Sequence, residues 1–319
     1  MVPWSPGGRS TIIRIYDRLR SKSDPMGDIN ELTQECASLM DLGKYGKAAR
    51  CYDKVLELKP ENATAWTNKG NSLMNLRKYL EAIACCDKGI ELDPRNVTAW
   101  IIKGKCIQNL FGKRHEAIEC YDKAIELDPK NAEAWQNKGT VLRNWGGYEK
   151  ADECYDRVIK LDPRNIKAWN GKLDLCERVI MLNFANVQAW NNKGIALRNL
   201  GRCDEALKAF NISIEFDSRF AAAWYNKGIA LYDLKKYDEA IECHGKATGL
   251  DPSYAKAWYA KGLALAFQAE YEKAIKAFDS DIKINPQCTK AWRAKGIALR
   301  ALGHTYEADV AFAVASGLG

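Results

Sequence analysis

The amino-acid sequence predicts an all-α protein built from repeated pairs of helices. Three observations support this prediction: tryptophans recur at a nearly constant interval, each opens a similar motif, and the apolar residues between them follow helical spacing. A single helix pair cannot bury its own apolar face, so neighbouring pairs must stack against one another. We therefore expect a solenoid of stacked helix-turn-helix units.

The tryptophan period defines the units. The repeating tryptophans are Trp66, Trp100, Trp135, Trp169, Trp190, Trp224, Trp258 and Trp292. Their spacing is nearly constant, and only the step from Trp169 to Trp190 is clearly shorter. Seven of these tryptophans begin the motif W-x-x-K-G, whereas Leu173 replaces the glycine after Trp169. An alanine follows about twelve residues after most of the glycines, and an Asp-Pro or Asn-Pro pair closes most units.

This combination of residues closely resembles the tetratricopeptide repeat family, and the resemblance covers roughly residues 29–319. It implies a right-handed α-solenoid in which the first helix of each repeat, helix A, lines a concave groove. In the unit that starts at Ala221, we expect helix A near Ala223 to Leu234 and helix B near Asp238 to Gly249. Pro252 cannot continue helix B and should end it.

The predicted organisation has four parts. Residues 1–28 form a basic leader, either a disordered tail or a short helix, and Met26 is an alternative start. Residues 29–165 hold repeats 1–4, and residues 187–319 hold repeats 6–9. Residues 166–186 form a truncated repeat, which we expect to be a single helix that breaks the superhelix. The alternative is that this truncation is an annotation deletion.

Composition excludes several classes of protein. No apolar run approaches the length of a membrane span, and the leader lacks the apolar core of a signal peptide. The formal net charge of +7 favours acidic partners, but no block of like charges indicates nucleic-acid binding. The eleven cysteines form no C-x-x-C pair, so we expect reduced thiols in a cytoplasmic protein.

No motif in the sequence indicates catalysis. There are only three histidines, and no histidine pair, nucleophile triad or glycine-rich phosphate loop accompanies them. His244 occupies the aromatic position of its helix B, so we expect a packed side chain. The lysine of each W-x-x-K-G motif is either a stem packed on apolar surface or part of a basic stripe. The sequence thus predicts no enzyme, no metal and no cofactor.

The resemblance places a peptide-binding surface on the A helices. Residues one, two and five positions after each tryptophan generally face the groove in this family. An asparagine two residues after tryptophan can grip a peptide backbone, because its amide both donates and accepts hydrogen bonds. The alternative is a helix-surface asparagine without a ligand. The asparagines at this position are Asn68, Asn137, Asn192 and Asn226.

The groove of repeats 7 and 8 is predicted to be apolar and aromatic, the type of surface that carries binding hot spots. Basic residues flank it and would take an acidic group of the ligand. The predicted apolar residues are Tyr225, Ile229, Tyr232, Tyr259, Leu263 and Phe267. The predicted basic residues are Arg198, Lys256, Lys290 and Arg293.

We therefore expect a protein-interaction scaffold that binds a peptide or partner helix. One alternative is a targeting subunit of a separate enzyme such as a glycosyltransferase, and a less favoured one is RNA binding. The last repeat lacks the polar capping helix that is usual in the family, so we also consider a homodimer through its apolar face. The sequence does not identify the partner, because repeats of this kind serve many pathways.

Overall fold

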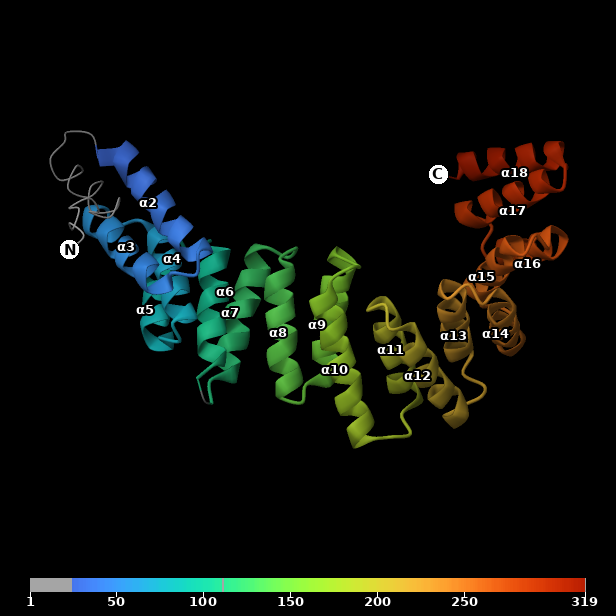
Figure 1. Ribbon diagram of the computed structural model, residues 1–319, viewed down its shortest axis with the longest axis horizontal. Coiled ribbons are helices and arrows are strands. Elements are labelled where there is room, and N and C mark those ends of the chain that lie inside the picture. The colour runs from blue at the N-terminus through green and yellow to red at the C-terminus, as the bar shows by residue number, and fades with distance from the viewer. Residues whose placement is uncertain (1–24, 111, 319) are drawn as a thin grey trace, which may run out of the picture. The chain divides into compact units, whose positions relative to one another are not determined.

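The computed structural model describes residues 25–110 and 112–318, and every regular element in these ranges is an α-helix (Figure 1). This confirms the predicted all-α fold of stacked helix-turn-helix units. Most of the expected N-terminal leader lies outside the described residues. By its internal contacts the chain divides into two units, Met1–Pro163 and Arg164–Gly319.

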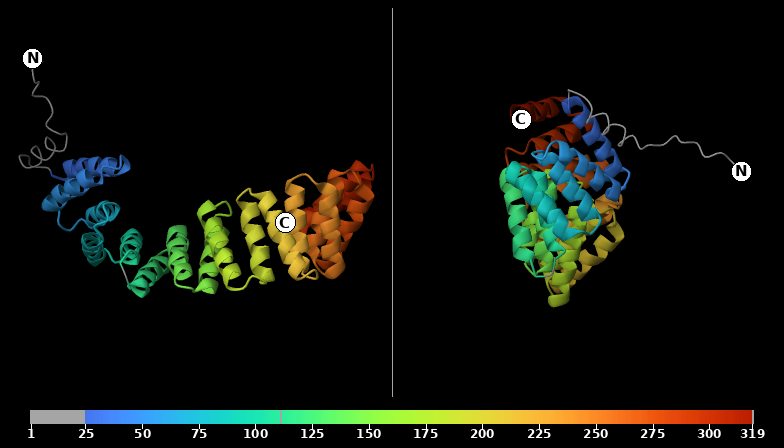
Figure 2. Two further views of the ribbon diagram at one scale, coloured as in Figure 1. Left: turned by 60° about the horizontal axis from the view of Figure 1, so that its bottom comes forward. Right: turned by 90° about the vertical axis from the view of Figure 1, so that its left-hand side faces the viewer.

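The first unit consists of helices that pair with their neighbours in the chain (Figure 2). Its A helices also contact one another in succession, α2 with α4, α4 with α6, and α6 with α8. The helices are α2 (Pro25–Asp41), α3 (Tyr45–Leu58), α4 (Ala63–Asn75), α5 (Tyr79–Leu92), α6 (Val97–Gln108), α7 (Arg114–Leu127), α8 (Ala132–Asn144) and α9 (Tyr148–Leu161).

The second unit begins with α10, one continuous helix over the residues assigned to the truncated repeat. Complete helix pairs follow, and the A helices α11, α13, α15 and α17 contact one another in that order. The helices are α10 (Ile166–Leu182), α11 (Val187–Asn199), α12 (Cys203–Phe216), α13 (Ala221–Asp233), α14 (Tyr237–Leu250), α15 (Ala255–Phe267), α16 (Tyr271–Ile284), α17 (Thr289–Ala301) and α18 (Thr305–Gly317).

Two polar devices fix the start of the A helices. An asparagine caps several of them, as where the Asn62 side chain accepts a hydrogen bond from the Ala65 amide at 3.0 Å. The indole of the repeat tryptophan also donates to a carbonyl six residues earlier, for example from Trp258 to Pro252 at 3.0 Å. The tryptophan thereby ties the helix to the turn before it, also where the acceptor is not a proline, as at Phe184 and Ser218.

Most A helices cross their B helix at the motif glycine, where a ring fills the space that a side chain would need; at Gly70 the Cys86 sulfur takes this place. At Gly194, an added Cβ would lie 2.4 Å from a ring carbon of Phe210. At Gly262, it would lie 2.5 Å from Phe278. Both aromatic residues are fully buried. Glycine and a later aromatic residue therefore recur with the repeat because the two helices of a pair approach closely at this point.

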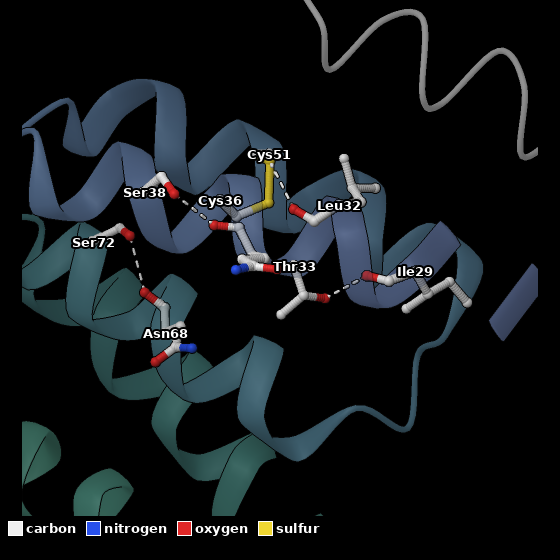
Figure 3. The surroundings of a disulfide bond; sticks show 9 residues. Ile29, Leu32, Thr33, Cys36, Ser38, Cys51, Asn68 and Ser72 are labelled. Atoms are coloured by element: carbon white, nitrogen blue, oxygen red, sulfur yellow. Dashed lines mark hydrogen bonds between the residues drawn. A yellow bond between two sulfur atoms is a disulfide. The ribbon is translucent and has the colours of Figure 1, made fainter. Parts of the chain in front are cut away.

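The first helix pair contains a disulfide bond between Cys36 and Cys51, with Cα atoms 5.4 Å apart (Figure 3). This corrects the expectation that all cysteines are reduced. Cys36 occupies the position of the motif glycine, and Cys51 faces it from α3. At Gly139, an added Cβ would lie 3.1 Å from the Cβ of Cys154, so the glycine position of a repeat lies directly against this cysteine position of the facing helix. The other nine cysteines are free.

Candidate protein-binding surface

The predicted binding residues lie on A helices in both units. Asn68 lies on α4 and Asn137 on α8, in the first unit. The other twelve lie on α11, α13, α15 and α17, which contact one another in sequence. The second unit therefore brings together most of the predicted surface.

The asparagines of the second unit already take part in a hydrogen-bond network. Asn226 donates from its side-chain amide to Asn191 at 2.9 Å, between α13 and α11. Asn192 accepts a hydrogen bond from Gln188 at 2.8 Å. Asn191 is buried and was not predicted, because it lies one residue before the expected position. These contacts orient the amides along adjacent A helices, and a peptide would compete with them for the same groups.

The asparagines of the first unit are partly buried. The Nδ2 atom of Asn137 is buried and has no hydrogen-bond partner within the described residues. The backbone carbonyl of Asn68 accepts a hydrogen bond from the Ser72 hydroxyl at 2.9 Å (Figure 3). A buried amide without a partner is costly, so Asn137 is a group that a ligand or a water molecule would satisfy.

Three aromatic rings form a cluster on the second unit. The ring centroids of Tyr232 and Phe267 lie 5.5 Å apart, and Tyr237 lies 5.4 Å from each of them. Phe267 is 64% exposed, which is high for so large an apolar side chain. Tyr237 was missed because it opens helix α14, outside the positions that face the groove in this family. The cluster presents an apolar surface on helices α13, α14 and α15.

The other predicted aromatic residues pack more deeply. Tyr225 lies 5.0 Å from Tyr254 and 5.7 Å from His244, and Tyr259 lies 5.9 Å from Phe278, between ring centroids. Burial raises the pKa of Tyr225 and of Tyr259. Ile229 and Leu263 are likewise only partly exposed. These residues thus support the A-helix surface more than they project from it.

The predicted basic residues fall into two kinds. Arg198 forms an ion pair with Asp233 at 2.5 Å between Nε and Oδ2, which joins α11 to α13. Lys256, Lys290 and Arg293 are exposed on α15 and α17, and no carboxylate pairs with them within the described part of the chain. Among the predicted basic residues, those without an ion pair therefore lie on α15 and α17.

The lysines of the W-x-x-K-G motifs have a structural role. The ammonium of Lys69 lies 5.2 Å from the centroid of the Trp66 ring and 2.6 Å from the Asp53 carboxylate on the preceding helix. Equivalent contacts recur along both units. Most of these lysines therefore hold neighbouring repeats together, which agrees with a packed stem rather than a free basic stripe.

Neither a metal site nor a membrane span is found in residues 25–110 and 112–318. No group of three or more histidine, cysteine, aspartate or glutamate residues there could hold a metal ion. No helix there is long and apolar enough to cross a membrane. His244 is buried among aromatic residues, and burial lowers its pKa to about 4. It therefore packs as a neutral side chain, as its position in the repeat predicted.

Family models confirm the repeat assignment. Models of the tetratricopeptide repeat match residues 63–96, 97–131, 120–153, 187–219, 221–254 and 255–288, and a TPR repeat model matches residues 38–77. These matches together span more than half of the chain, so the protein belongs to the tetratricopeptide repeat family. None of them includes residues 154–186, which contain helix α10.

Solved structures of similar proteins include MamA and YrrB. A crystal structure of MamA is 26% identical over 56% of this chain and 93% of that chain, with a TM-score of 0.42. YrrB, described as a TPR protein with an unusual peptide-binding site, is 23% identical over 66% of this chain and 97% of that chain, with a TM-score of 0.35. MamA from Desulfovibrio magneticus RS-1 is 21% identical over 59% of this chain and 94% of that chain, with a TM-score of 0.41. No curated protein matches the chain.

Proposed function

We propose that this protein is a non-enzymatic scaffold that binds a peptide segment or helix of a partner along the A helices of its second unit. The family fold supports a protein-interaction scaffold, and the aromatic cluster supports this location. Phe267 is exposed beside Tyr232 and Tyr237, which hold its ring from two sides. A rigid aromatic side chain binds a partner at a low entropic cost, as at many interface hot spots.

Charge favours an acidic group in the ligand, separated from its apolar anchor by about the length of an A helix, because Lys256 lies at the start of α15 and Phe267 at its end. Lys256, Lys290 and Arg293 are exposed on the helices that carry or follow Phe267. A carboxylate of the ligand would gain charge-assisted hydrogen bonds from them. Asn192 and Asn226 would contact the ligand backbone. Arg198 would contribute less, because Asp233 already neutralises it.

An affinity pull-down from the source cell's lysate tests this function. The test variant carries Phe267→Ala and Tyr232→Ala, which remove the exposed cluster while keeping the more buried Tyr225. The control variant carries Tyr306→Ala on α18, because this aromatic side chain is 78% exposed and lies outside the A helices. We expect a protein that the wild type and the control capture and that the test variant loses.

The identity of the captured molecule separates the alternatives. A stable complex with an enzyme such as a glycosyltransferase would make this protein a targeting subunit. Capture of RNA that falls steeply with salt would favour nucleic-acid binding. Capture of a second copy of the chain would favour self-association, for which Ile297 and Val310 are exposed on the last helix pair. Equal capture by wild type and test variant would place the partner site elsewhere.

A further inference from the structure

The lysine of the W-x-x-K-G motif usually pairs with a carboxylate that stands at a fixed sequence offset before it. The carboxylate lies on the preceding helix, and the distance from Nζ to the oxygen is between 2.5 and 3.0 Å. These pairs are Lys69–Asp53, Lys103–Asp87, Lys138–Asp122, Lys193–Glu177 and Lys295–Asp279. At each of these five junctions, where an A helix packs on the helix before it, a carboxylate oxygen therefore occupies the same position beside the lysine.

Lys227 and Lys261 depart from this pattern in two consecutive repeats. Asn211 and Gly245 stand at the corresponding positions before them, so the carboxylate is missing in both places. Neither ammonium lies within 4.0 Å of another carboxylate among the residues that the structure describes. Each still lies over the ring of its tryptophan, at 5.5 and 5.3 Å from the centroid. The two lysines therefore keep their orientation without their usual counterion.

The space of the missing carboxylate is open at Lys261. An added Cβ at Gly245 would meet only one atom within 4 Å, the Nζ of Lys261 at 3.8 Å. Lys261 itself is partly buried, so its charge is less well hydrated than that of an exposed lysine. An acidic oxygen from outside the chain could occupy this space and pair with the ammonium.

A pocket of about 550 Å³ adjoins Lys261. Trp258, Ile241 and Leu265 supply apolar walls, and Lys273 and Lys276 add positive charge. The two carboxylates of the lining already have partners within the protein: Glu270 pairs with Lys273, and Asp238 accepts a hydrogen bond from Gln268 at 2.7 Å. The pocket thus combines apolar walls with an excess of positive charge, because Lys261 and Lys276 are unpaired among the described residues and only the Asp238 carboxylate, held by a neutral amide, opposes them.

The equivalent pocket of the first unit has the opposite character. It contains Trp100, Lys103 and Ile107, which correspond to Trp258, Lys261 and Leu265. Its Lys103 is paired with Asp87, and its remaining charged residues are mostly acidic. The acidic residues are Glu116, Glu119, Asp122 and Glu126. The basic pocket is therefore a local feature of the second unit and not a general consequence of the repeat.

The pocket at Lys261 is distinct from the aromatic surface of the proposed function. Trp258, Lys261 and Leu265 are spaced three and four residues apart and share one side of α15. Tyr259, Leu263 and Phe267 are spaced four residues apart and lie on the opposite side, by the 3.6-residue turn of the helix. One helix therefore carries two separate surfaces.

We propose that Lys261 and its pocket, extended by Lys227 one repeat earlier, form a second docking site that binds an acidic segment of a partner protein. A carboxylate of the partner takes the place of the missing aspartate beside Lys261, and a neighbouring apolar side chain lies against Trp258 and Ile241. Carboxylates occupy this position in the five paired junctions, so we assign the group to an aspartate or glutamate of the partner.

Fluorescence anisotropy with a short fluorescein-labelled peptide of alternating glutamate and leucine tests the proposal, at low ionic strength. In the variant Gly245→Asp, the chain supplies the missing carboxylate itself and should compete with the peptide. We expect affinity to fall about tenfold or more for Gly245→Asp and for Lys261→Ala, the amount expected for one charge-assisted contact. Lys103→Ala in the paired junction and Tyr306→Ala on α18, outside both proposed surfaces, should leave affinity unchanged.

Several outcomes would overturn the proposal. These are failure of the wild type to bind the peptide, unchanged binding by Gly245→Asp and Lys261→Ala, and equal binding of a glutamine-for-glutamate peptide. Loss of binding only in Phe267→Ala would move the peptide to the aromatic surface. Binding of a single-stranded oligonucleotide in place of the peptide would assign the site to phosphate groups of nucleic acid. Circular dichroism of each variant confirms that the helices are retained.

Discussion

Lys193 and Glu177 form an ion pair, with 3.0 Å between Nζ and Oε1, that joins α11 to α10. Glu177 lies in the second half of the single helix α10. Asp279 stands at the same sequence offset before Lys295 and pairs with it in the same way, although Asp279 lies in a complete helix B. The second half of α10 therefore makes the same ion pair with α11 that a helix B makes with the next A helix. This contact shows how the single helix of the truncated repeat still packs against the following repeat.

We predict that this ion pair contributes modestly to stability. A double-mutant cycle with Glu177→Gln and Lys193→Met should give a coupling free energy of about 0.5–1 kcal/mol, because both side chains remain partly exposed to water. The measurement is urea unfolding of the four proteins. The coupling should shrink as salt is added, since ions screen exposed charges. A coupling that is independent of salt would contradict this interpretation.

Where a buried ring faces the motif glycine, as at Gly194, a side chain should be poorly tolerated. Gly194→Ala would place a Cβ 2.4 Å from the ring of Phe210, so we expect a loss of about 1–3 kcal/mol in the free energy of unfolding through overpacking. Gly245→Ala is the matched control, because only the Lys261 ammonium lies nearby. It should be neutral or stabilising by up to about 1 kcal/mol, as alanine favours helix. Thermal unfolding of both variants tests the contrast.

Much of the fold follows from the sequence because the repeat encodes its own contacts. Tryptophan, lysine, glycine and the later aromatic residue each contact a specific part of the neighbouring helix, so their period predicts the stacking. Helix A of the unit at Ala221 is expected near Ala223 to Leu234 and runs from Ala221 to Asp233. The remaining differences lie at helix ends, where caps and turns decide the boundary.

Both cysteines of the disulfide stand at recognisable positions of the repeat, but the period alone does not show that these positions are in contact. Cys36 replaces the motif glycine of its repeat, and Cys51 is one of a series of cysteines at one position of helix B. Only the crossing geometry shows that these two positions face each other. Once that is known, Cys36 is the one cysteine at a glycine position of the W-x-x-K-G series.

The candidate site was less predictable, because it depends on contacts between repeats. Arg198 on α11 pairs with Asp233 on α13, which leaves less free charge than its sequence position suggested. Tyr237 joins Tyr232 and Phe267 from a different helix. The missing carboxylates at positions 211 and 245 become visible only against the pairs in the other repeats. Side-chain exposure and ion pairing depend on contacts between repeats, so the period of the sequence does not predict them.

The disulfide predicts a specific thiol count. Protein denatured without reductant should take up alkylating reagent at nine cysteines, and protein reduced first should take it up at all eleven. Intact-mass spectrometry measures both. Reduction should also weaken the first helix pair by about 3 kcal/mol, the entropic estimate for a loop of about 15 residues. Uptake at eleven cysteines without reductant would contradict the bridge.

His244 should make the stability of the protein depend on pH. The side chain is fully buried, neither ring nitrogen has a hydrogen-bond partner among the described residues, and burial, reinforced by the nearby Lys261 charge, lowers its pKa to about 4. In the unfolded chain the pKa returns to about 6.5, so between these values only the unfolded state takes up the proton. Lowering the pH from 7 to 5 should therefore destabilise the native state by about 2 kcal/mol through this residue.

The variant His244→Phe isolates this effect. Phe210 and Phe278 occupy the same position in other repeats, and each packs against the motif glycine of its own repeat, so phenylalanine fits the local geometry. We expect the variant to be more stable at pH 7, because it buries no unsatisfied ring nitrogen, and to lose less stability on acidification than the wild type. Urea unfolding at pH 7 and pH 5 measures both quantities. His304→Ala is the control, because His304 is exposed in a turn near Glu307 and should leave the pH dependence close to that of the wild type. If wild type and His244→Phe lost equal stability between the two pH values, His244 would not be held neutral in the folded protein.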